Sequence, residues 1–176
     1  MIVKNTFVIS AFPACGKSYC FENYQDKFSI LDSDSSEFSW TKDENGNNTT
    51  NRNPNFPQNY IEHIKSNIGK VDVIFVSSHE TVRQGLYENN INTILVYPSK
   101  DMKDDFIKRY RNRGNNESFI NFISSNWNRF INEIESEGYG FLKHRLNKEN
   151  PYLDLDFLYS LNDKSSGNLS YMWSNN

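Results

Sequence analysis

The residues best suited to chemistry lie near the amino terminus, in the stretch AFPACGKS (11–18). The spacing fits A-x-x-x-x-G-K-S, with Ala11 where a phosphate-binding loop ordinarily has its first glycine. Gly16 lets the backbone approach phosphates closely, Lys17 supplies charge to the β- and γ-phosphates, and the Ser18 hydroxyl is suited to ligate Mg²⁺. A β-rich run precedes the stretch and a helical run follows it. The sequence therefore predicts a phosphate-binding loop, with an ordinary β–α turn as the alternative.

This loop predicts a nucleotide cofactor. Successive backbone N–H groups converging on an anion, followed by the positive end of a helix, hold phosphates in such loops. We therefore expect ATP and Mg²⁺ to be the cofactors, with Lys17 also acting in catalysis. The residues expected to contact ATP are Pro13, Ala14, Cys15, Gly16, Lys17, Ser18 and Tyr19.

Two carboxylates end the second predicted strand, FSILDSD (28–34). Ligands gather at the carboxyl ends of parallel strands, and Asp32 and Asp34 share a face if the strand continues through both. We expect Asp32 to orient the acceptor or to act as its base. We expect Asp34 to bind the metal with Ser18, and both carboxylates to belong to the acceptor site. The alternative is a solvated turn or helix cap, because Asp and Ser are common caps.

Strand-like and helix-like segments alternate along the chain. The predicted strands are 5–10, 28–34, 71–78, 92–98 and 141–146, and the predicted helices are 17–25, 57–68, 80–89, 101–113 and 116–137. The run VDVIFVSS is near-continuously apolar, as in parallel strands covered on both faces. We therefore predict an α/β fold with a mostly parallel sheet of about five strands and helices on both faces.

The chain of 176 residues is predicted to form one domain, 1–160. The asparagine-rich segment 41–58 has no hydrophobic period, and we expect a mobile surface insertion; the alternative is a flap over an acceptor site. Residues 161–176 are expected to form a weakly ordered tail.

Composition indicates a cytoplasmic protein. The two cysteines suit a reduced compartment, and no apolar run approaches membrane-spanning length. The net charge of −3 argues against a nucleic-acid partner. We expect a monomer or homodimer.

The motifs, taken in order, resemble those of P-loop kinases of the nucleotide and nucleoside group. AFPACGKS, DSDSSEFSW, VSSHETVR and the arginine-rich RYRNRGNNESFINF are similar to small kinase-like proteins of bacteriophages and Firmicutes. The resemblance covers about residues 5–158 and implies a three-layer P-loop NTPase fold with a lid. One departure is that the third strand ends in Ser77-Ser78-His79, without the usual Walker B carboxylate. Mg²⁺ is then held by Ser18 and phosphates alone, or with a carboxylate of the second strand.

Three alternating arginines, Arg109, Arg111 and Arg113, follow the fourth strand. In the family that the chain resembles, a lid at this place brings arginines onto the transferring phosphoryl group. We therefore expect a lid at about 109–117 and a catalytic role for all three. The alternative is a solvated basic helix end, favoured by the helix dipole.

Three further residues are candidates for acceptor binding. Trp40 is suited to stack on a base, and its alternative is a position in the core. His79 and Arg83 are suited to hold a phosphate or base of the acceptor. Their alternative is a helix-capping or surface position. The resemblance implies ATP-dependent phosphoryl transfer to a small nucleotide or nucleoside. The alternatives are a kinase of another hydroxyl, in a small metabolite or a modified DNA base, and a nucleotide-binding regulator without efficient transfer.

Overall fold

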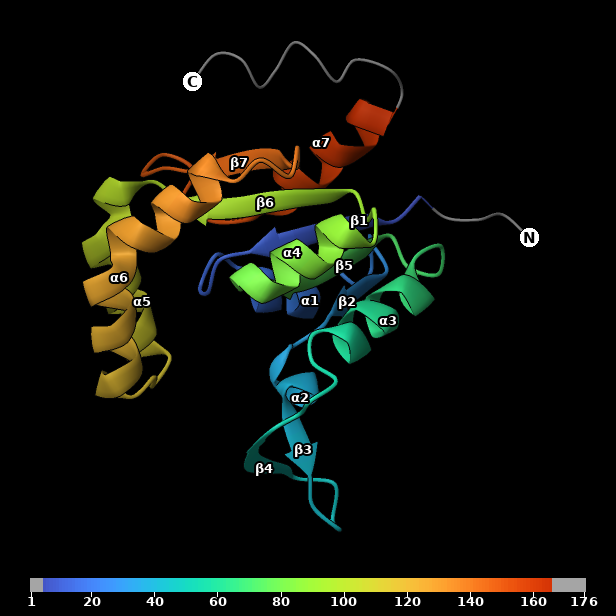
Figure 1. Cartoon of the computed structure of the whole chain (residues 1–176). Coiled ribbons are helices and arrows are strands. Elements are labelled where there is room, and N and C mark those ends of the chain that lie inside the picture. The colour runs from blue at the N-terminus through green and yellow to red at the C-terminus, as the bar shows by residue number, and fades with distance from the viewer. Residues whose placement is uncertain (1–4, 166–176) are drawn as a thin grey trace.

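The computed structural model describes residues 5–165, with side chains through residue 162. Its centre is a sheet of five parallel strands in the order β2-β5-β1-β6-β7 (Figure 1). In register, Ala11 at the end of β1 lies between Ser77 of β5 and Val96 of β6. The strands are β1 (Phe7–Ala11), β2 (Ile30–Asp32), β5 (Val73–Ser77), β6 (Thr93–Pro98) and β7 (Leu142–Leu146). The predicted α/β fold with about five strands is confirmed.

Alternating strand residues build a separate core on each face of the sheet. Val8 and Ile74 belong to one buried cluster, while Ile9 and Phe75 belong to the other. The first cluster is closed by α3 (Gln58–Asn67) and α4 (Glu80–Glu88). The second contains buried residues of α1 (Lys17–Asn23), α5 (Lys103–Asn112), α6 (Glu117–Ser136) and α7 (Leu155–Ser165). Helices therefore cover both faces, as the alternation of apolar residues predicts.

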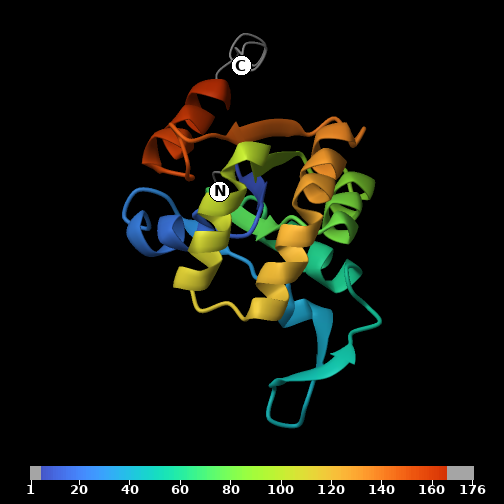
Figure 2. The same ribbon diagram turned by 90° about the vertical axis from the view of Figure 1, so that its left-hand side faces the viewer.

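Helices α5 and α6 form an antiparallel hairpin, seen side by side in Figure 2. Gly114 adopts φ +75° at the turn, where a residue with a Cβ would be strained. Asn116 caps α6 by accepting the Phe119 N–H at 2.8 Å. Residues 109–117, where a lid is expected, are the end of α5, this turn and the start of α6.

The segment 41–58, expected to be a mobile insertion, contains regular structure. Helix α2 (Ser36–Ser39) leads into an antiparallel hairpin of β3 (Trp40–Lys42) and β4 (Asn48–Arg52). The Asp43 carboxylate closes its turn by accepting the N–H groups of Asn45 and Asn47. Figure 1 shows this hairpin projecting away from the sheet. The segment therefore has regular structure that the lack of a hydrophobic period did not indicate, and its mobility stays a prediction.

The predicted domain boundary at residue 160 falls inside α7. Leu161 is buried in the main core, so the first residues of the expected tail belong to the folded domain. Residues 166–176 of that tail lie outside the described part.

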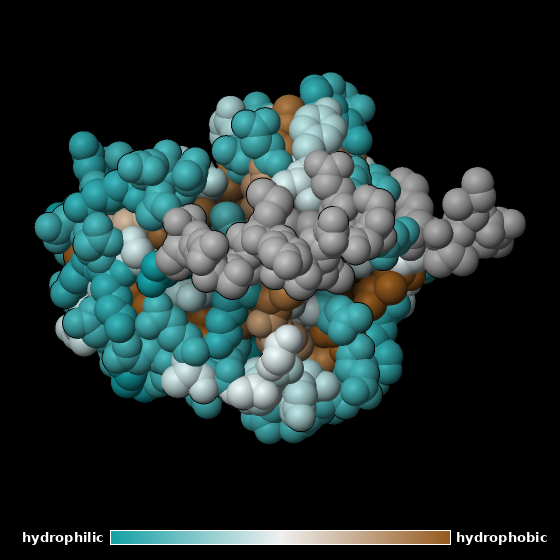
Figure 3. All heavy atoms as spheres, turned by 90° about the horizontal axis from the view of Figure 1, so that it is seen from above, coloured by the Kyte–Doolittle hydropathy of each residue, from teal (hydrophilic) through white to brown (hydrophobic). Residues whose placement is uncertain are grey.

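Hydrophilic residues make up most of the face above β7 and α7 (Figure 3). Within residues 5–165, no helix is both long enough and apolar enough to cross a membrane.

Candidate functional site

A cleft of about 1560 Å³ opens where the parallel strands end. Its walls are the β1–α1 loop, the end of β2, the β5–α4 junction, the α5–α6 hairpin and the returning strand β4. In Figure 1, the α5–α6 hairpin and the α2–β4 segment both extend below the sheet. A site for one small ligand typically has about 300–1,000 Å³. The cleft therefore has room for two ligands side by side.

The β1–α1 loop (residues 12–16) has its carbonyl groups engaged by the protein. The oxygens from Ala11 through Gly16 all accept hydrogen bonds. Their donors are, in that order, the Lys17 ammonium, the Cys15 N–H, the Tyr110 hydroxyl, the Arg109 guanidinium, the Leu153 N–H and the Cys20 N–H. Each of these carbonyl oxygens is therefore bonded to a donor of the protein. A carbonyl oxygen without a donor would repel an anion in the cleft, and none of these six is left without one.

Lys17 and Gly16 join this loop to α1. The Lys17 Nζ lies 2.8 Å from the Ala11 carbonyl oxygen, and both residues line the cleft. Burial lowers the pKa of Lys17, because no carboxylate among the described residues lies in direct contact to offset the loss of water. Gly16 has φ +108°, and a Cβ there would lie 3.2 Å from the Leu153 carbonyl oxygen. Glycine is therefore required here both by conformation and by the close approach of Leu153.

The other loop residues predicted to bind ATP divide into two groups. Pro13, Ala14, Ser18 and Tyr19 line the cleft. Cys15 is fully buried, so its thiol is turned into the core and only its backbone remains for a ligand. Burial raises the pKa of both Cys15 and Cys20 to about 12, and both thiols are free. Neither thiol is set up as a nucleophile.

Asp32 and Asp34 both line the cleft, but in different settings. The Ser18 hydroxyl donates to Asp32 Oδ2 at 3.1 Å. Burial raises the pKa of Asp32 above its usual range, against the opposing charge of Lys17. Strand β2 ends at Asp32, and Asp34 Oδ1 accepts the Ser36 N–H at 2.9 Å, next to α2. The assumption that one strand continues through both residues is therefore wrong. Asp34 forms a turn just before α2, whose N-cap is Ser35, so the turn interpretation applies to Asp34.

The structure brings two of the three predicted arginines into the cleft. Arg109 donates to the Ala14 carbonyl oxygen at 3.1 Å, and its guanidinium carbon lies 3.9 Å from the centre of the Tyr152 ring. Arg113 lines the cleft and forms no ion pair within the described residues. Arg111 does not line the cleft: it is exposed and lies 3.7 Å from Glu117. The placement of Arg111 does not support the expected catalytic role.

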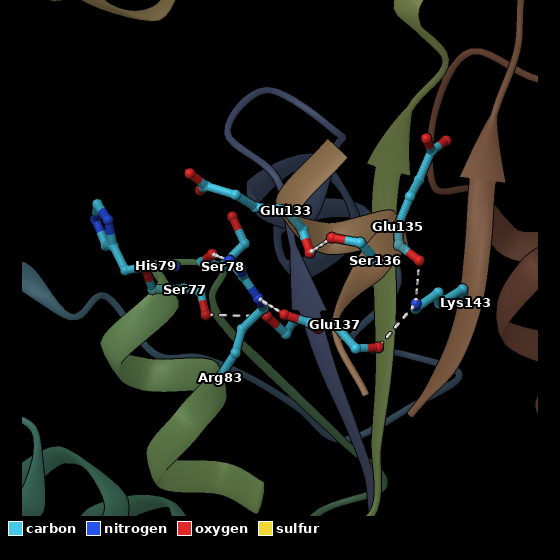
Figure 4. A network of polar contacts seen from close by, with 10 residues as sticks. Ser77, Ser78, His79, Arg83, Glu133, Glu135, Ser136, Glu137 and Lys143 are labelled. Carbon is cyan, nitrogen blue, oxygen red and sulfur yellow. Dashed lines mark hydrogen bonds and ion pairs between the residues drawn. The ribbon is translucent and has the colours of Figure 1, made fainter. Parts of the chain in front are cut away.

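Arg83, predicted to bind the acceptor, is held in a buried ion pair. Its Nε donates to Glu137 Oε2 at 2.6 Å, and its Nη1 donates to the Ser78 carbonyl oxygen (Figure 4). Only 4% of Arg83 is exposed. The carboxylate that neutralises it lies 54 residues away in sequence. Arg83 therefore links α4 to the end of α6. It also lines the cleft, so its expected role in acceptor binding stays a prediction beside this structural one.

The two aromatic acceptor candidates have different positions. His79 is exposed on the cleft wall at the start of α4, without a capping hydrogen bond from its side chain. Desolvation by the cleft walls, then the charges of Arg52 and Arg83, lower its pKa. Trp40 is not among the residues that line the cleft within the described chain. Its ring is covered by Arg52, whose guanidinium carbon lies 4.2 Å from the ring centre.

Among the residues of the cleft wall that sequence reasoning missed, four carry a charge or an aromatic ring of interest. Arg52 on β4 lines the cleft, and so do Phe122 and Phe130 of α6 and Tyr152 after β7. The two phenylalanines fit the apolar period of α6, which by itself would assign both to the core; Phe130 does pack against the core, whereas Phe122 is exposed. Arg52 and Tyr152 lie in loop-rich segments and carry no local signal of a site.

A magnesium ion fits the oxygen atoms at one place in this cleft. Within residues 5–162, no group of three or more His, Cys, Asp and Glu side chains is arranged to hold a metal by itself. The Ser18 hydroxyl and the Asp32 carboxylate supply two neighbouring oxygens. Mg²⁺ prefers oxygen ligands and usually keeps phosphate and water ligands as well as one or two protein groups. These two residues would hold it.

No family model matches the chain, and no curated protein matches it.

Proposed function

We propose that this chain is a P-loop kinase that transfers the γ-phosphoryl group of ATP to a small nucleotide or nucleoside. The observation that carries the proposal is the β1–α1 loop. Its carbonyl oxygens from Ala11 to Gly16 are bonded to protein donors, while Lys17 and Ser18 follow on the cleft wall. Phosphate sites of this kind need backbone N–H groups and a lysine facing the anion. The resemblance of AFPACGKS to such loops supports the same assignment.

Lys17 would bind the donor phosphates. In the free protein its ammonium donates to a carbonyl oxygen, and burial lowers its pKa. Phosphate oxygens would give the ammonium negative partners in direct contact, so binding would raise its pKa again. The charge of Lys17 is therefore better matched to a bound polyphosphate than to the free protein.

Ser18 and Asp32 would bind Mg²⁺, and Asp34 would serve the acceptor. The hydrogen bond between Ser18 and Asp32 places a second oxygen beside the serine hydroxyl, whereas Asp34 stands further along the wall, exposed. This reverses the roles expected from the sequence for the two carboxylates. Bound Mg²⁺ supplies charge neutralisation for the β- and γ-phosphates. Asp34 would accept a hydrogen bond from the acceptor hydroxyl and orient it.

Arg109 and Arg113 would contact the phosphates from the α5–α6 hairpin. Arg109 is fixed between Phe106 and Tyr152, with ring-centre distances of 4.2 and 3.9 Å, and suits a positioning role. Arg113 lines the cleft and has no carboxylate partner within the described residues. The pKa of Lys17 is lowered mainly by burial, and the nearby positive charge of Arg113 lowers it further. Such a cation stabilises the charge of the transferring phosphoryl group where water is excluded.

The test is a transfer assay with labelled ATP and Mg²⁺. The acceptors are the common nucleosides and nucleoside monophosphates, with sugars, sugar phosphates and DNA containing modified bases as comparison acceptors. We expect label on one or a few nucleosides or nucleoside monophosphates. Label only on a sugar or on DNA would contradict the acceptor class, and slow hydrolysis without any transfer would contradict the kinase.

A further inference from the structure

Helix α6 presents two phenylalanines to the cleft: Phe130 is half-buried and packs against the main core, whereas the packing of the helix does not explain Phe122. Phe122 and Phe130 line the cleft with ring centres 5.6 Å apart, and the Arg129 guanidinium carbon lies 4.9 Å from the Phe130 ring centre. Arg129 also lines the cleft. We call Phe122, Arg129 and Phe130 the α6 aromatic wall.

The core side of α6 is a different stripe of the helix. The buried residues are Ile120, Ile123, Trp127, Ile131 and Ile134. Phe122 belongs to neither core cluster and is 55% exposed, although an exposed phenylalanine gains nothing from contact with water. Folding therefore does not account for a phenylalanine at position 122, whereas a ligand in the cleft would.

Helix α6 lies on the side of the cleft nearer to α2 and α4, whereas α5 lies nearer to α1 (Figure 2). We call the side of α2 and α4 the acceptor half of the cleft. Further along the helix, Glu133 extends toward the β5–α4 junction, and the Arg83–Glu137 ion pair ties the end of α6 to Ser78 (Figure 4). Strand β5 pairs with β2, the strand that ends at Asp32. Arg109 and Tyr152, in contrast, lie against Ala14 of the β1–α1 loop, in the half assigned to ATP.

We propose that the α6 aromatic wall binds the planar base of the acceptor, so that the acceptor is a nucleoside or nucleotide and not a sugar-like metabolite. This inference rests on the proposed kinase function and names the substrate class of that site. Aromatic rings stack on every base because each base has a π-face, and a nearby arginine adds a cation–π contribution. A sugar has no such face. The base would lie against Phe122 and Phe130, with its sugar directed toward Asp34.

Phe122 can be replaced without disturbing the core because it is exposed, so three variants at this position test the inference. Phe122→Ala removes the ring, Phe122→Leu keeps apolar surface without a π-face, and Phe122→Trp enlarges the ring. Tyr159→Ala is the matched control, because Tyr159 is an exposed aromatic residue outside the cleft. Circular dichroism and melting temperature establish that each variant is folded.

We expect Phe122→Ala to raise KM for the acceptor about 10-fold, a change typical of losing one base-stacking ring. KM for ATP should stay unchanged, Phe122→Leu should not restore binding, and Phe122→Trp should. An unchanged acceptor KM in Phe122→Ala, a rise in KM for ATP instead, or full rescue by Phe122→Leu would overturn the inference. Absence of transfer by the wild-type protein with every acceptor would instead overturn the proposed function.

A binding measurement decides the inference without turnover. In the Phe122→Trp variant, nucleoside monophosphates should quench fluorescence beyond the change seen in the wild-type protein. Ribose 5-phosphate, which has the sugar and phosphate but no base, should not. Equal quenching by both compounds, or quenching by neither, would contradict base stacking at position 122.

Discussion

The hydroxyl of Ser18 at the start of α1 donates to the carboxylate of Asp32 at the end of β2, with 3.1 Å between the oxygens. The two strands that lead into these residues are not neighbours, because β5 lies between β1 and β2. Strand β5 itself ends at Ser77, is followed by Ser78, and has no carboxylate there. The end of β5 has no carboxylate, and we infer that Asp32 supplies one from β2, the next strand of the sheet.

The two aspartates should fail in different ways. Asp32→Asn should raise the Mg²⁺ concentration needed for half-maximal transfer, because a metal-binding charge is lost beside Ser18. Asp34→Asn should raise KM for the acceptor and leave the Mg²⁺ requirement unchanged; asparagine can still accept the Ser36 N–H, so this contact at α2 is kept. Magnesium titrations and acceptor kinetics on both variants measure this. The reverse pattern would restore the assignment expected from the sequence.

The stability of the free protein should depend on pH through Asp32. Burial raises its pKa in the folded state, so the folded protein binds more protons than the unfolded chain between the usual value, about 3.9, and the raised one. The contribution of the Asp32 carboxyl to the free energy of unfolding is fully present below pH 3.9, about its unfolded pKa, and is lost as pH rises through its raised folded pKa. Asp32→Asn should therefore be more stable than wild type at pH 7, because the amide carries no charge to desolvate. Urea unfolding from pH 4 to 8 measures the difference, which should shrink toward pH 4; a difference independent of pH would contradict the buried carboxylate.

Arg113 and Arg111 provide a matched pair within one turn. Arg113→Ala should lower kcat about 10³-fold, as expected when an arginine that stabilises the transferring phosphoryl group is lost. Arg111→Ala should change kcat little, since Arg111 is exposed beside Glu117 and outside the cleft. Steady-state kinetics with saturating ATP decide between them. Equal losses in both variants would mean that the hairpin rearranges in the working enzyme.

Removing one member of the Arg83–Glu137 pair should destabilise the fold. Arg83→Ala leaves the Glu137 carboxylate buried without its cation, a change that typically costs about 3–5 kcal/mol. The double variant Arg83→Met with Glu137→Leu should recover much of the loss, because no buried charge remains. Chemical unfolding of the single and double variants measures both effects. A fully stable Arg83→Ala variant with a raised acceptor KM would favour the substrate-binding role of Arg83 over the structural one.

The strands and the long helices could be predicted because their signals are local. The apolar run around Ile74 and the four-residue spacing in α6 each specify an element without reference to the rest of the chain. The hairpin of β3 and β4 was missed because polar and β-branched residues replace the usual apolar alternation. Its turn signal, Gly46 with φ +81°, is present in the sequence.

Cleft residues were predictable where a local motif or the end of a predicted strand or helix marks them, as for Asp32 and Arg113. Lys17 and Ser18 follow from one loop motif, and their places on the cleft wall match the expectation. The ion pair of Arg83 could not be predicted, because the carboxylate that neutralises it lies 54 residues away. The exposure of Phe122 could not be predicted, because helical spacing separates apolar from polar faces but cannot distinguish a core face from a cleft wall.

The central claim is most directly tested by comparing phosphoryl transfer by wild-type protein and Lys17→Ala, with labelled ATP at saturation and the acceptor found in the screen. Lys17 lines the cleft and its ammonium donates to one carbonyl oxygen, so its removal should leave the melting temperature nearly unchanged or raise it. We predict that transfer falls to background in the folded variant. Transfer at the wild-type rate by a folded Lys17→Ala protein would contradict the assignment of residues 11–18 as the phosphate-binding loop.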